Sequence, residues 1–310
     1  MENLNSAQKD LPLPPSLSPP PTLPQSVHTS EEIVQHLSPH LLHLNYHNLT
    51  TKLQVVSAVF SFFLLVFLVS LSLVLFIPIF KQLKLKDKVS ACLCITRGMF
   101  GISCIVLGGH AMTSTTNIHR DVVFGRSATS SFTMLFTTGF FSFELASSLI
   151  SDLYFRTFSK LLTIHHLLGM VGYGLAELYY EKFHMIGVIG VLLEMSTPFT
   201  GVSFFLEKCG MGKSALWKLN QLLLIHTFHL RSVVEFYIWY LYLHNFQHVN
   251  QHMPSVLLGV FLMYLSLLSF VMTPYWGYRK TKQLFVSGKS SVDDVNMTET
   301  LVHGEVKKIL

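Results

Sequence analysis

Two adjacent histidines, His165 and His166, lie in an apolar stretch of the chain. A neutral imidazole can take a proton from a hydroxyl group or can itself carry an acyl group, and a nearby carboxylate can orient the ring. Glu144 and Glu194 lie in neighbouring apolar stretches and could supply that carboxylate. We therefore predict a catalytic group for proton or acyl transfer that consists of His165, His166, Glu194 and Glu144.

Further polar side chains interrupt the apolar stretches. An ionisable side chain inside a membrane is costly and almost always faces the interior of the protein or a cavity. Arginines at such positions could bind the phosphate of an anionic substrate. We predict a substrate-binding group that consists of Arg97, Asn220, His226, His229 and Arg231.

The helix expected at 216–242 carries polar residues on two faces. At 3.6 residues per turn, Asn220 and Arg231 lie on one side and His229 lies nearly opposite. We therefore expect this helix at the centre of the bundle. Arg231 could instead form an ion pair with Glu235 at the i,i+4 spacing. The two histidines of this helix lack a further ligand at metal-binding spacing, so we predict no metal.

A proline indicates a break in the helix that carries Glu194. Pro198 follows Glu194 by four residues and lacks an N–H group, so the carbonyl oxygen of Glu194 loses its helical partner. We expect a kink there that opens a polar pocket beside the buried carboxylate.

The composition indicates that a membrane protein positions these residues. Half of the 310 residues are hydrophobic and 13% are charged, whereas soluble domains carry about 25% charged residues. The net charge of +5 comes from short basic clusters between apolar runs. These features exclude a soluble globular enzyme, a disordered protein and a nucleic-acid binder with a basic patch. We predict an all-α fold, a polytopic helical bundle of about seven transmembrane helices.

The apolar runs define the domains. A helix needs about 20 residues to cross a bilayer. We expect a disordered Pro-rich lumenal tail at 1–53, a transmembrane domain at 54–285 and a cytosolic tail at 286–310. The seven runs lie at about 55–79, 89–112, 129–150, 159–179, 184–206, 216–242 and 255–276.

Basic residues indicate the topology. The segments after the odd-numbered runs hold thirteen lysines and arginines, and the loops on the opposite side hold three. The positive-inside rule then predicts a lumenal N-terminus and a cytosolic C-terminus. Lys307 and Lys308 stand fourth and third from the end, where they match a dilysine retrieval signal for coat proteins. We predict a multi-pass protein of the endoplasmic reticulum (ER) membrane and the ER–Golgi intermediate compartment.

Four groups of residues resemble one family, the TLC-domain proteins, over about residues 80–285. This family contains ceramide synthases, translocon-associated proteins and other lipid-handling members. The resemblance implies a helical bundle around a lipid-accessible cavity. The four groups are Ile164 to Leu167, Leu192 to Thr200, Trp217 to Gln221, and Pro274 to Trp276 followed by Lys280 to Leu284.

The resemblance also implies a chemistry. In the ceramide synthases a histidine pair transfers a fatty acyl group from acyl-CoA to an amine, and His165 and His166 match that pair. Residues 200–209 lack the Asp-rich pattern of the synthases, which argues against ceramide synthesis. Because arginines repel an amine and suit an anion, we expect a lysophospholipid acceptor, with lysophosphatidylglycerol preferred. Acyl-CoA would be a co-substrate, and no bound cofactor is expected.

A second hypothesis makes the chain a non-enzymatic receptor. The members that these motifs resemble most imply roles in lipid homeostasis and lysosome biogenesis, as an ER-to-Golgi cargo receptor for newly made lysosomal enzymes. The lumenal segments 113–128 and 245–253 are short for a stable interface, so a membrane partner protein would share the cargo. Membrane lipids are partners under both hypotheses, and nucleic acid is a partner under neither. A proton-coupled transporter is a third hypothesis, because intramembrane His and Glu also relay protons.

Overall fold

The computed structural model describes residues 44–113 and 117–286. The chain divides into two units, Met1–Ser38 and Pro39–Leu310, and all described residues belong to the second. The retrieval signal at Lys307 and Lys308 and most of the two predicted tails lie outside the described residues.

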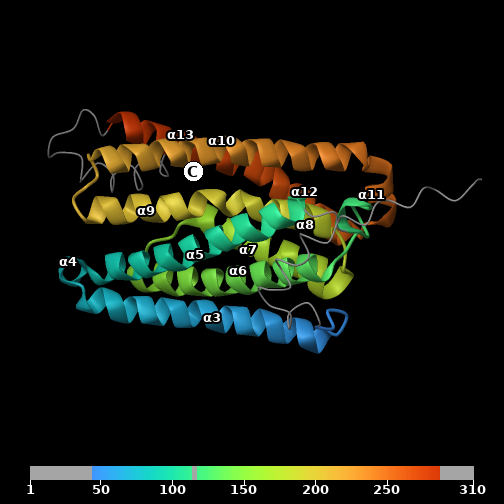
Figure 1. Cartoon of the computed structure of the whole chain (residues 1–310), viewed down its shortest axis with the longest axis horizontal. Helices are drawn as coiled ribbons and strands as arrows, with labels where there is room; N and C mark the ends of the chain where they lie inside the picture. Colours follow the sequence, from blue (N-terminus) through green and yellow to red (C-terminus); the bar gives the residue numbers. More distant parts are fainter. Residues whose placement is uncertain (1–43, 114–116, 287–310) are drawn as a thin grey trace, which may run out of the picture. The chain divides into compact units, whose positions relative to one another are not determined.

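Regular structure in the described residues is entirely helical (Figure 1), which confirms the all-α prediction. Helices occur at all seven expected positions. Six helical stretches are long and apolar enough to cross a membrane. The seventh, Ala215–His244, is 30 residues long but is interrupted by polar residues. In chain order the elements are α3 (Leu49–Phe76), α4 (Pro78–Lys81), α5 (Leu85–Thr113), η1 (Asn117–His119), α6 (Ala128–Phe155), α7 (Lys160–Gly174), η2 (Leu175–Tyr180), α8 (His184–Val191), η3 (Leu192–Ser196), α9 (Thr197–Lys208), α10 (Ala215–His244), α11 (Phe246–His252), α12 (Ser255–Leu267), η4 (Leu268–Met272) and α13 (Thr273–Val286).

Several of the expected boundaries differ from the structure, including the end of the last run, which was expected at 276 and lies at Val286. α3 begins at Leu49, because the side chain of Asn48 accepts a hydrogen bond from the Thr50 N–H and caps the helix. The prediction that the disordered tail extends to residue 53 is therefore wrong for its last residues. The expected loop at 245–253 contains the short helix α11.

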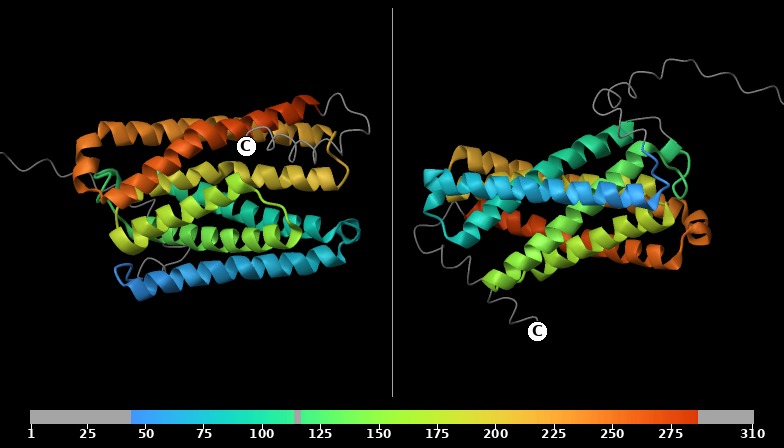
Figure 2. Two further views of the ribbon diagram at one scale, coloured as in Figure 1. Left: turned by 180° about the vertical axis from the view of Figure 1, so that it is seen from behind. Right: turned by 90° about the horizontal axis from the view of Figure 1, so that it is seen from below.

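The helices run side by side along one direction (Figures 1 and 2). α3, α5 and α6 pack against one another, and aromatic rings fill the space between them. The ring centroids of Phe100 and Phe140 are 3.6 Å apart, and those of Phe63 and Phe140 are 4.8 Å apart. On the other side of the bundle, α10 packs against α9 and α13. α5 packs against α9 and so joins the two groups, while α7 contacts α6 and α12.

α10 lies at the edge of the bundle (Figure 1). One face carries Asn220, Arg231 and Glu235, which are buried. The opposite face carries His226 and His229, which are exposed. The expectation of a central position is therefore wrong. An imidazole presents an apolar body with a polar tip, so a helix face with two histidines does not require a protein neighbour.

The kink expected at Pro198 is present as the 3₁₀ turn η3 between α8 and α9. In this turn the Thr197 N–H donates to the carbonyl oxygen of Glu194, which thereby recovers a partner. Gly101 of α5 packs against the turn. A Cβ atom at Gly101 would lie 2.9 Å from that carbonyl oxygen and 2.6 Å from Cδ of Pro198. The absence of a side chain thus allows α5 to contact the kink directly.

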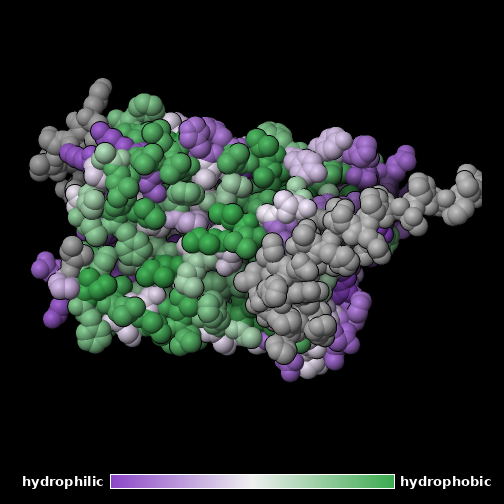
Figure 3. Space-filling model, viewed as in Figure 1, coloured by the Kyte–Doolittle hydropathy of each residue, from purple (hydrophilic) through white to green (hydrophobic). Residues whose placement is uncertain are grey.

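The surface agrees with a membrane setting. Hydrophobic side chains cover the middle of the face in Figure 3, and hydrophilic side chains gather toward its two ends. α3 exposes many large apolar side chains, including Leu65 and Phe76, which are 60% and 81% exposed. A multi-pass membrane bundle explains this exposure, because lipid then covers the middle of the molecule.

Candidate functional site

The histidine pair lies in the second turn of α7 and is buried. The side chains of His165 and His166 are nearly inaccessible, and their ring centroids are 5.2 Å apart. Phe141 of α6 packs against both rings, with centroid distances of 5.8 Å. The pair therefore faces α6 and the bundle interior, as its position in the sequence predicts.

His165 is held at both ring nitrogens. Its Nε2 lies 3.2 Å from Oε1 of Glu194, and its Nδ1 lies 3.0 Å from the hydroxyl of Tyr264. Because an ionised carboxylate only accepts hydrogen bonds, we assign the proton of neutral His165 to Nε2. Thr197 donates to the other oxygen of Glu194 at 3.0 Å. The 3₁₀ turn thus positions the carboxylate that orients the imidazole.

His166 lies beside a second carboxylate. Its Nδ1 is 4.0 Å from Oε1 of Glu144 and has no hydrogen-bond partner. Oε1 of Glu144 accepts from Nε of Arg97 at 2.8 Å, from a second guanidinium nitrogen, and from Ser148 at 2.9 Å. Oε2 of Glu144 is buried and has no partner. Each histidine therefore has its own carboxylate, and the four predicted catalytic residues lie together.

Arg231 reaches the pair through an aromatic ring. Its guanidinium carbon lies 5.5 Å from the Trp276 ring centroid, which is 5.7 Å from that of His165. Nε of Arg231 lies 3.7 Å from Glu235, and Thr273 bridges the two by accepting from Arg231 at 3.2 Å and donating to Glu235 at 2.5 Å. The alternative ion pair is therefore present. Nη2 of Arg231 is buried and has no hydrogen-bond partner among the described residues, so one donor of the guanidinium is unpaired.

The remaining predicted substrate-binding residues lie elsewhere. Nδ2 of Asn220 donates to the carbonyl oxygen of Phe199 at 2.9 Å and so joins α10 to α9. His226 and His229 contact each other on the exposed face of α10. In the part of the chain that the structure describes, no three His, Cys, Asp or Glu side chains are placed to hold a metal ion.

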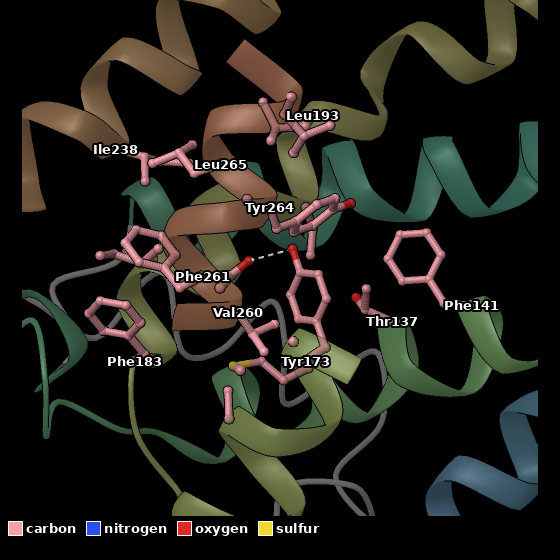
Figure 4. A pocket seen from close by; sticks show the side chains of 18 of the residues that line it. Thr137, Phe141, Tyr173, Phe183, Leu193, Ile238, Val260, Phe261, Tyr264 and Leu265 are labelled. Carbon is pink, nitrogen blue, oxygen red and sulfur yellow. Dashed lines mark hydrogen bonds between the residues drawn. The ribbon is translucent and has the colours of Figure 1, made fainter. Parts of the chain in front are cut away.

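A mostly apolar cavity borders the histidine cluster through Glu194 and Tyr264, and Figure 4 shows Tyr264 in its wall. Its empty space is about 760 Å³, including the part where it opens outward. Glu194 and Tyr264 line one end, and Phe183 and Leu257 line the other. Leu257 and Tyr264 are separated by seven residues of α12, or about 10 Å at 1.5 Å per residue. The cavity thus places apolar walls beside a polar end.

The comparisons with known proteins place the chain in a family. The TLC domain matches residues 87–282, which include every residue of the histidine cluster. The chain belongs to the TLC-domain family. This result confirms the resemblance that the four motifs predicted.

The chain is also similar to named relatives. The chain is 36% identical to Protein CLN8 of Homo sapiens over 205 residues, which are 66% of this chain and 72% of the relative. It is 35% identical to Protein CLN8 of Rattus norvegicus and 34% identical to that of Mus musculus, in each case over 66% of this chain and 71% of the relative. No solved structure matches the chain.

The sequence analysis of the TLC domain missed contributors to the cluster. Tyr264 binds His165 directly, and Ser148 binds Glu144, yet neither was predicted. Trp276 belongs to a recognised motif but had no assigned role. Tyr264 lies in an apolar run, where a tyrosine looks the same as any aromatic core residue. Residue type alone therefore did not indicate that Tyr264 belongs to the site.

A second polar cluster lies at the other end of α7, partly outside the matched TLC domain. Glu177 of η2 is fully buried and lies 3.6 Å from Nζ of Lys52, 3.0 Å from Arg126 and 3.0 Å from His184. Glu181 forms ion pairs with Lys52 at 2.5 Å and with Arg126. Burial alone would raise the pKa of the Glu181 carboxyl, but the hydrogen bond from Lys52 and the charge of Arg126 outweigh it and lower that pKa. This cluster joins α3, the start of α6, η2 and α8.

Proposed function

We propose that this TLC-domain protein transfers an acyl group from acyl-CoA to a lipid acceptor. The observation that carries the proposal is the histidine pair with its two carboxylates at the polar end of a mostly apolar cavity. Binding pockets for small molecules are mostly apolar, with a few polar groups that fix orientation. An acyl chain in this cavity would place its thioester beside the two imidazoles.

The cluster supplies what acyl transfer needs. The acceptor hydroxyl attacks the thioester carbon, a new C–O bond forms, and the C–S bond breaks. An imidazole takes the hydroxyl proton and returns it to the leaving sulfur. The Glu194 carboxylate holds His165 in place and stabilises its protonated form, while the buried Nδ1 atom of His166 has no hydrogen-bond partner among the described residues.

An anionic lipid is the preferred acceptor. Arg231 presents a buried guanidinium nitrogen without a partner next to Trp276, and Arg97 lies beside His166 through Glu144. Guanidinium groups bind phosphate through charge-assisted hydrogen bonds. These residues support a lysophospholipid such as lysophosphatidylglycerol.

The proposed setting is the membrane of the ER and the ER–Golgi intermediate compartment, with roles in lipid homeostasis and lysosome biogenesis. The basic residues after the odd-numbered spans support a lumenal N-terminus and a cytosolic C-terminus. Lys307 and Lys308 would recycle the protein through coat proteins.

An acyl-CoA transfer assay on the purified full-length protein tests the proposal, with lysophospholipids and sphingoid bases as acceptors. We expect turnover of a lysophospholipid that falls at least about 100-fold in the His165→Ala/His166→Ala double variant, the range that general acid–base groups supply. The matched control is His226→Ala/His229→Ala, on the exposed face of α10, which should keep wild-type turnover. A folded double variant with unchanged turnover, or a folded wild type that acylates no acceptor, contradicts the proposal.

A cargo receptor for lysosomal enzymes, with a membrane partner protein, is the second candidate. Its support is that loops far apart in the sequence form one surface at the end of the bundle with α11. Nε2 of His248 lies 3.1 Å from Asp121, and Nζ of Lys182 donates to the carbonyl oxygen of His252 at 2.7 Å. The double-alanine variant separates the candidates, because a receptor would still bind lysosomal enzymes after both buried histidines are removed.

A further inference from the structure

Tyr264 is hydrogen-bonded to His165 but has no role so far in the proposed reaction. It extends from α12 into the cavity wall (Figure 4). Its hydroxyl oxygen lies 3.0 Å from Nδ1 of His165, and the two ring centroids are 5.8 Å apart. Tyr264 therefore stands between the cavity and the imidazole.

The direction of the hydrogen bonds follows from the carboxylate. Glu194 accepts from Nε2 of His165, so Nδ1 carries a lone pair and the hydroxyl of Tyr264 donates to it. The tyrosine oxygen keeps its own lone pairs, and these can accept a hydrogen bond from a ligand in the cavity. Both nitrogens of His165 are occupied. A proton from a substrate can therefore reach this imidazole through the Tyr264 oxygen without breaking the bond to Glu194.

We propose that Tyr264 is a catalytic residue that relays the proton of the acceptor hydroxyl to His165. This inference rests on the proposed acyl transfer. As the acceptor oxygen bonds to the thioester carbon, its proton moves to the Tyr264 oxygen, and the proton of Tyr264 moves to Nδ1 of His165. The resulting imidazolium is stabilised by Glu194. When the C–S bond breaks, the proton returns along the same path to the thiolate of CoA, and Tyr264 and His165 end as they began.

The cavity contains a second tyrosine that serves as a matched control. Tyr173 of α7 also lines the cavity, but its hydroxyl donates to the carbonyl oxygen of Gly187 at 3.0 Å (Figure 4). The hydroxyl hydrogen of Tyr173 is therefore used in a hydrogen bond to the backbone of α8. Removing either hydroxyl enlarges the same cavity by one oxygen atom, whereas only Tyr264 binds the histidine pair.

The experiment compares Tyr264→Phe and Tyr173→Phe in the purified full-length protein, with acyl-CoA and a lysophospholipid as substrates. We expect Tyr264→Phe to lower kcat about 100-fold or more and to leave KM for acyl-CoA within about twofold, because the cavity wall is retained. Tyr173→Phe measures the effect of removing a hydroxyl from the cavity wall, and the loss of kcat in Tyr264→Phe should exceed that effect at least about tenfold. In ¹⁵N spectra of histidine-labelled protein, Tyr264→Phe should shift the Nδ1 resonance of His165, and Tyr173→Phe should not.

Each of the other possible results contradicts one specific claim about Tyr264 or about acyl transfer. An active wild type whose kcat survives Tyr264→Phe overturns the relay and leaves the acyltransferase proposal standing. Equal losses in the two variants overturn the relay in favour of a change in cavity shape. An unshifted Nδ1 resonance shows that the hydrogen bond is absent. A wild type without transfer activity overturns the proposed function, and the relay with it.

Discussion

Glu177 is a fully buried carboxylate that lies within reach of two cations, Lys52 and Arg126, and one histidine, His184. Removing a carboxylate from water costs several kcal/mol unless opposite charges and hydrogen bonds compensate. The Lys52 ammonium compensates twice, because it also donates to the backbone oxygen of Glu177 at 2.6 Å. The network therefore depends on every member, since the loss of one leaves another charge unpaired.

Lys52→Met tests this dependence. Removing one partner of a buried ion pair costs about 3–5 kcal/mol, so the variant should unfold at a clearly lower temperature or denaturant concentration in detergent. Lys208→Met is the control, because Lys208 pairs with Asp87 at 2.9 Å where both side chains are about one-third exposed. Such an exposed pair contributes about 0–1 kcal/mol. Equal effects of the two substitutions would show that the buried network does not stabilise the bundle.

Glu181 gives the network a dependence on pH. A carboxyl group whose pKa is lower in the folded state stabilises that state above its unfolded pKa of about 4.3, and the contribution is lost as the pH falls through the folded pKa. The pKa of Glu181 is lowered in this way. We therefore expect wild-type protein to melt at a higher temperature than Glu181→Gln at pH 7, and this difference to shrink below about pH 4. A melting-temperature difference that stays constant from pH 7 to pH 3 would contradict the prediction.

Residue types predicted part of the site. His165, His166, Glu144 and Glu194 lie in neighbouring apolar runs, and the structure brings them together. The same reasoning failed for His226 and His229, because periodicity shows which residues share a helix face but not which face packs against protein. The network around Glu177 joins residues about 125 positions apart, and no local pattern reports such a contact.

At the scale of elements, η3 and α5 together position the carboxylate of the site. The proline predicted the break in the helix, but it did not predict how close another helix would come. Gly101 allows this approach, and a glycine in an apolar run gives no indication of its neighbour. Most helix ends were predicted to within a few residues, but α13 continues from the expected end at residue 276 to Val286, past the charges of Arg279 and Lys280. The start of α3 was missed because its first turns carry threonines and the buried Lys52.

Gly101→Ala should therefore disturb both stability and activity. The added Cβ would lie 2.6 Å from Cδ of Pro198 and 2.9 Å from the carbonyl oxygen of Glu194. Overpacking of this kind costs about 1–3 kcal/mol and moves Glu194 relative to His165. Melting temperature and acyl transfer should both fall. Gly109→Ala on the same helix meets nothing within 4 Å and should leave both unchanged or raise the melting temperature. Equal results for the two variants would contradict the role of Gly101.

At the scale of the whole described bundle, polar groups form two clusters at opposite ends of a mostly apolar cavity. Glu194 and Tyr264 border one end, while Ala176 and Phe183, neighbours of Glu177 and His184 in the sequence, line the other. Composition predicted a membrane bundle of about seven helices because too few charged residues are present to cover the chain in water. The sequence predicted a polar pocket at the Pro198 kink, and the family resemblance implied a lipid-accessible cavity. Neither predicted the mostly apolar walls, because empty space depends on how the side chains of several helices fit together.

The histidine cluster is assembled from distant parts of the chain, from Arg97 on α5 to Trp276 on α13. A ribosome that has completed α7 has made both histidines but neither Tyr264 nor Trp276. Arg97, Glu144 and Ser148 can already bind one another at that stage, whereas His165 lacks both Glu194 and Tyr264 until the later helices are made. Synthesis from the N-terminus thus gives the newborn protein an interval in which its histidine cluster is incomplete, and the final helices end that interval.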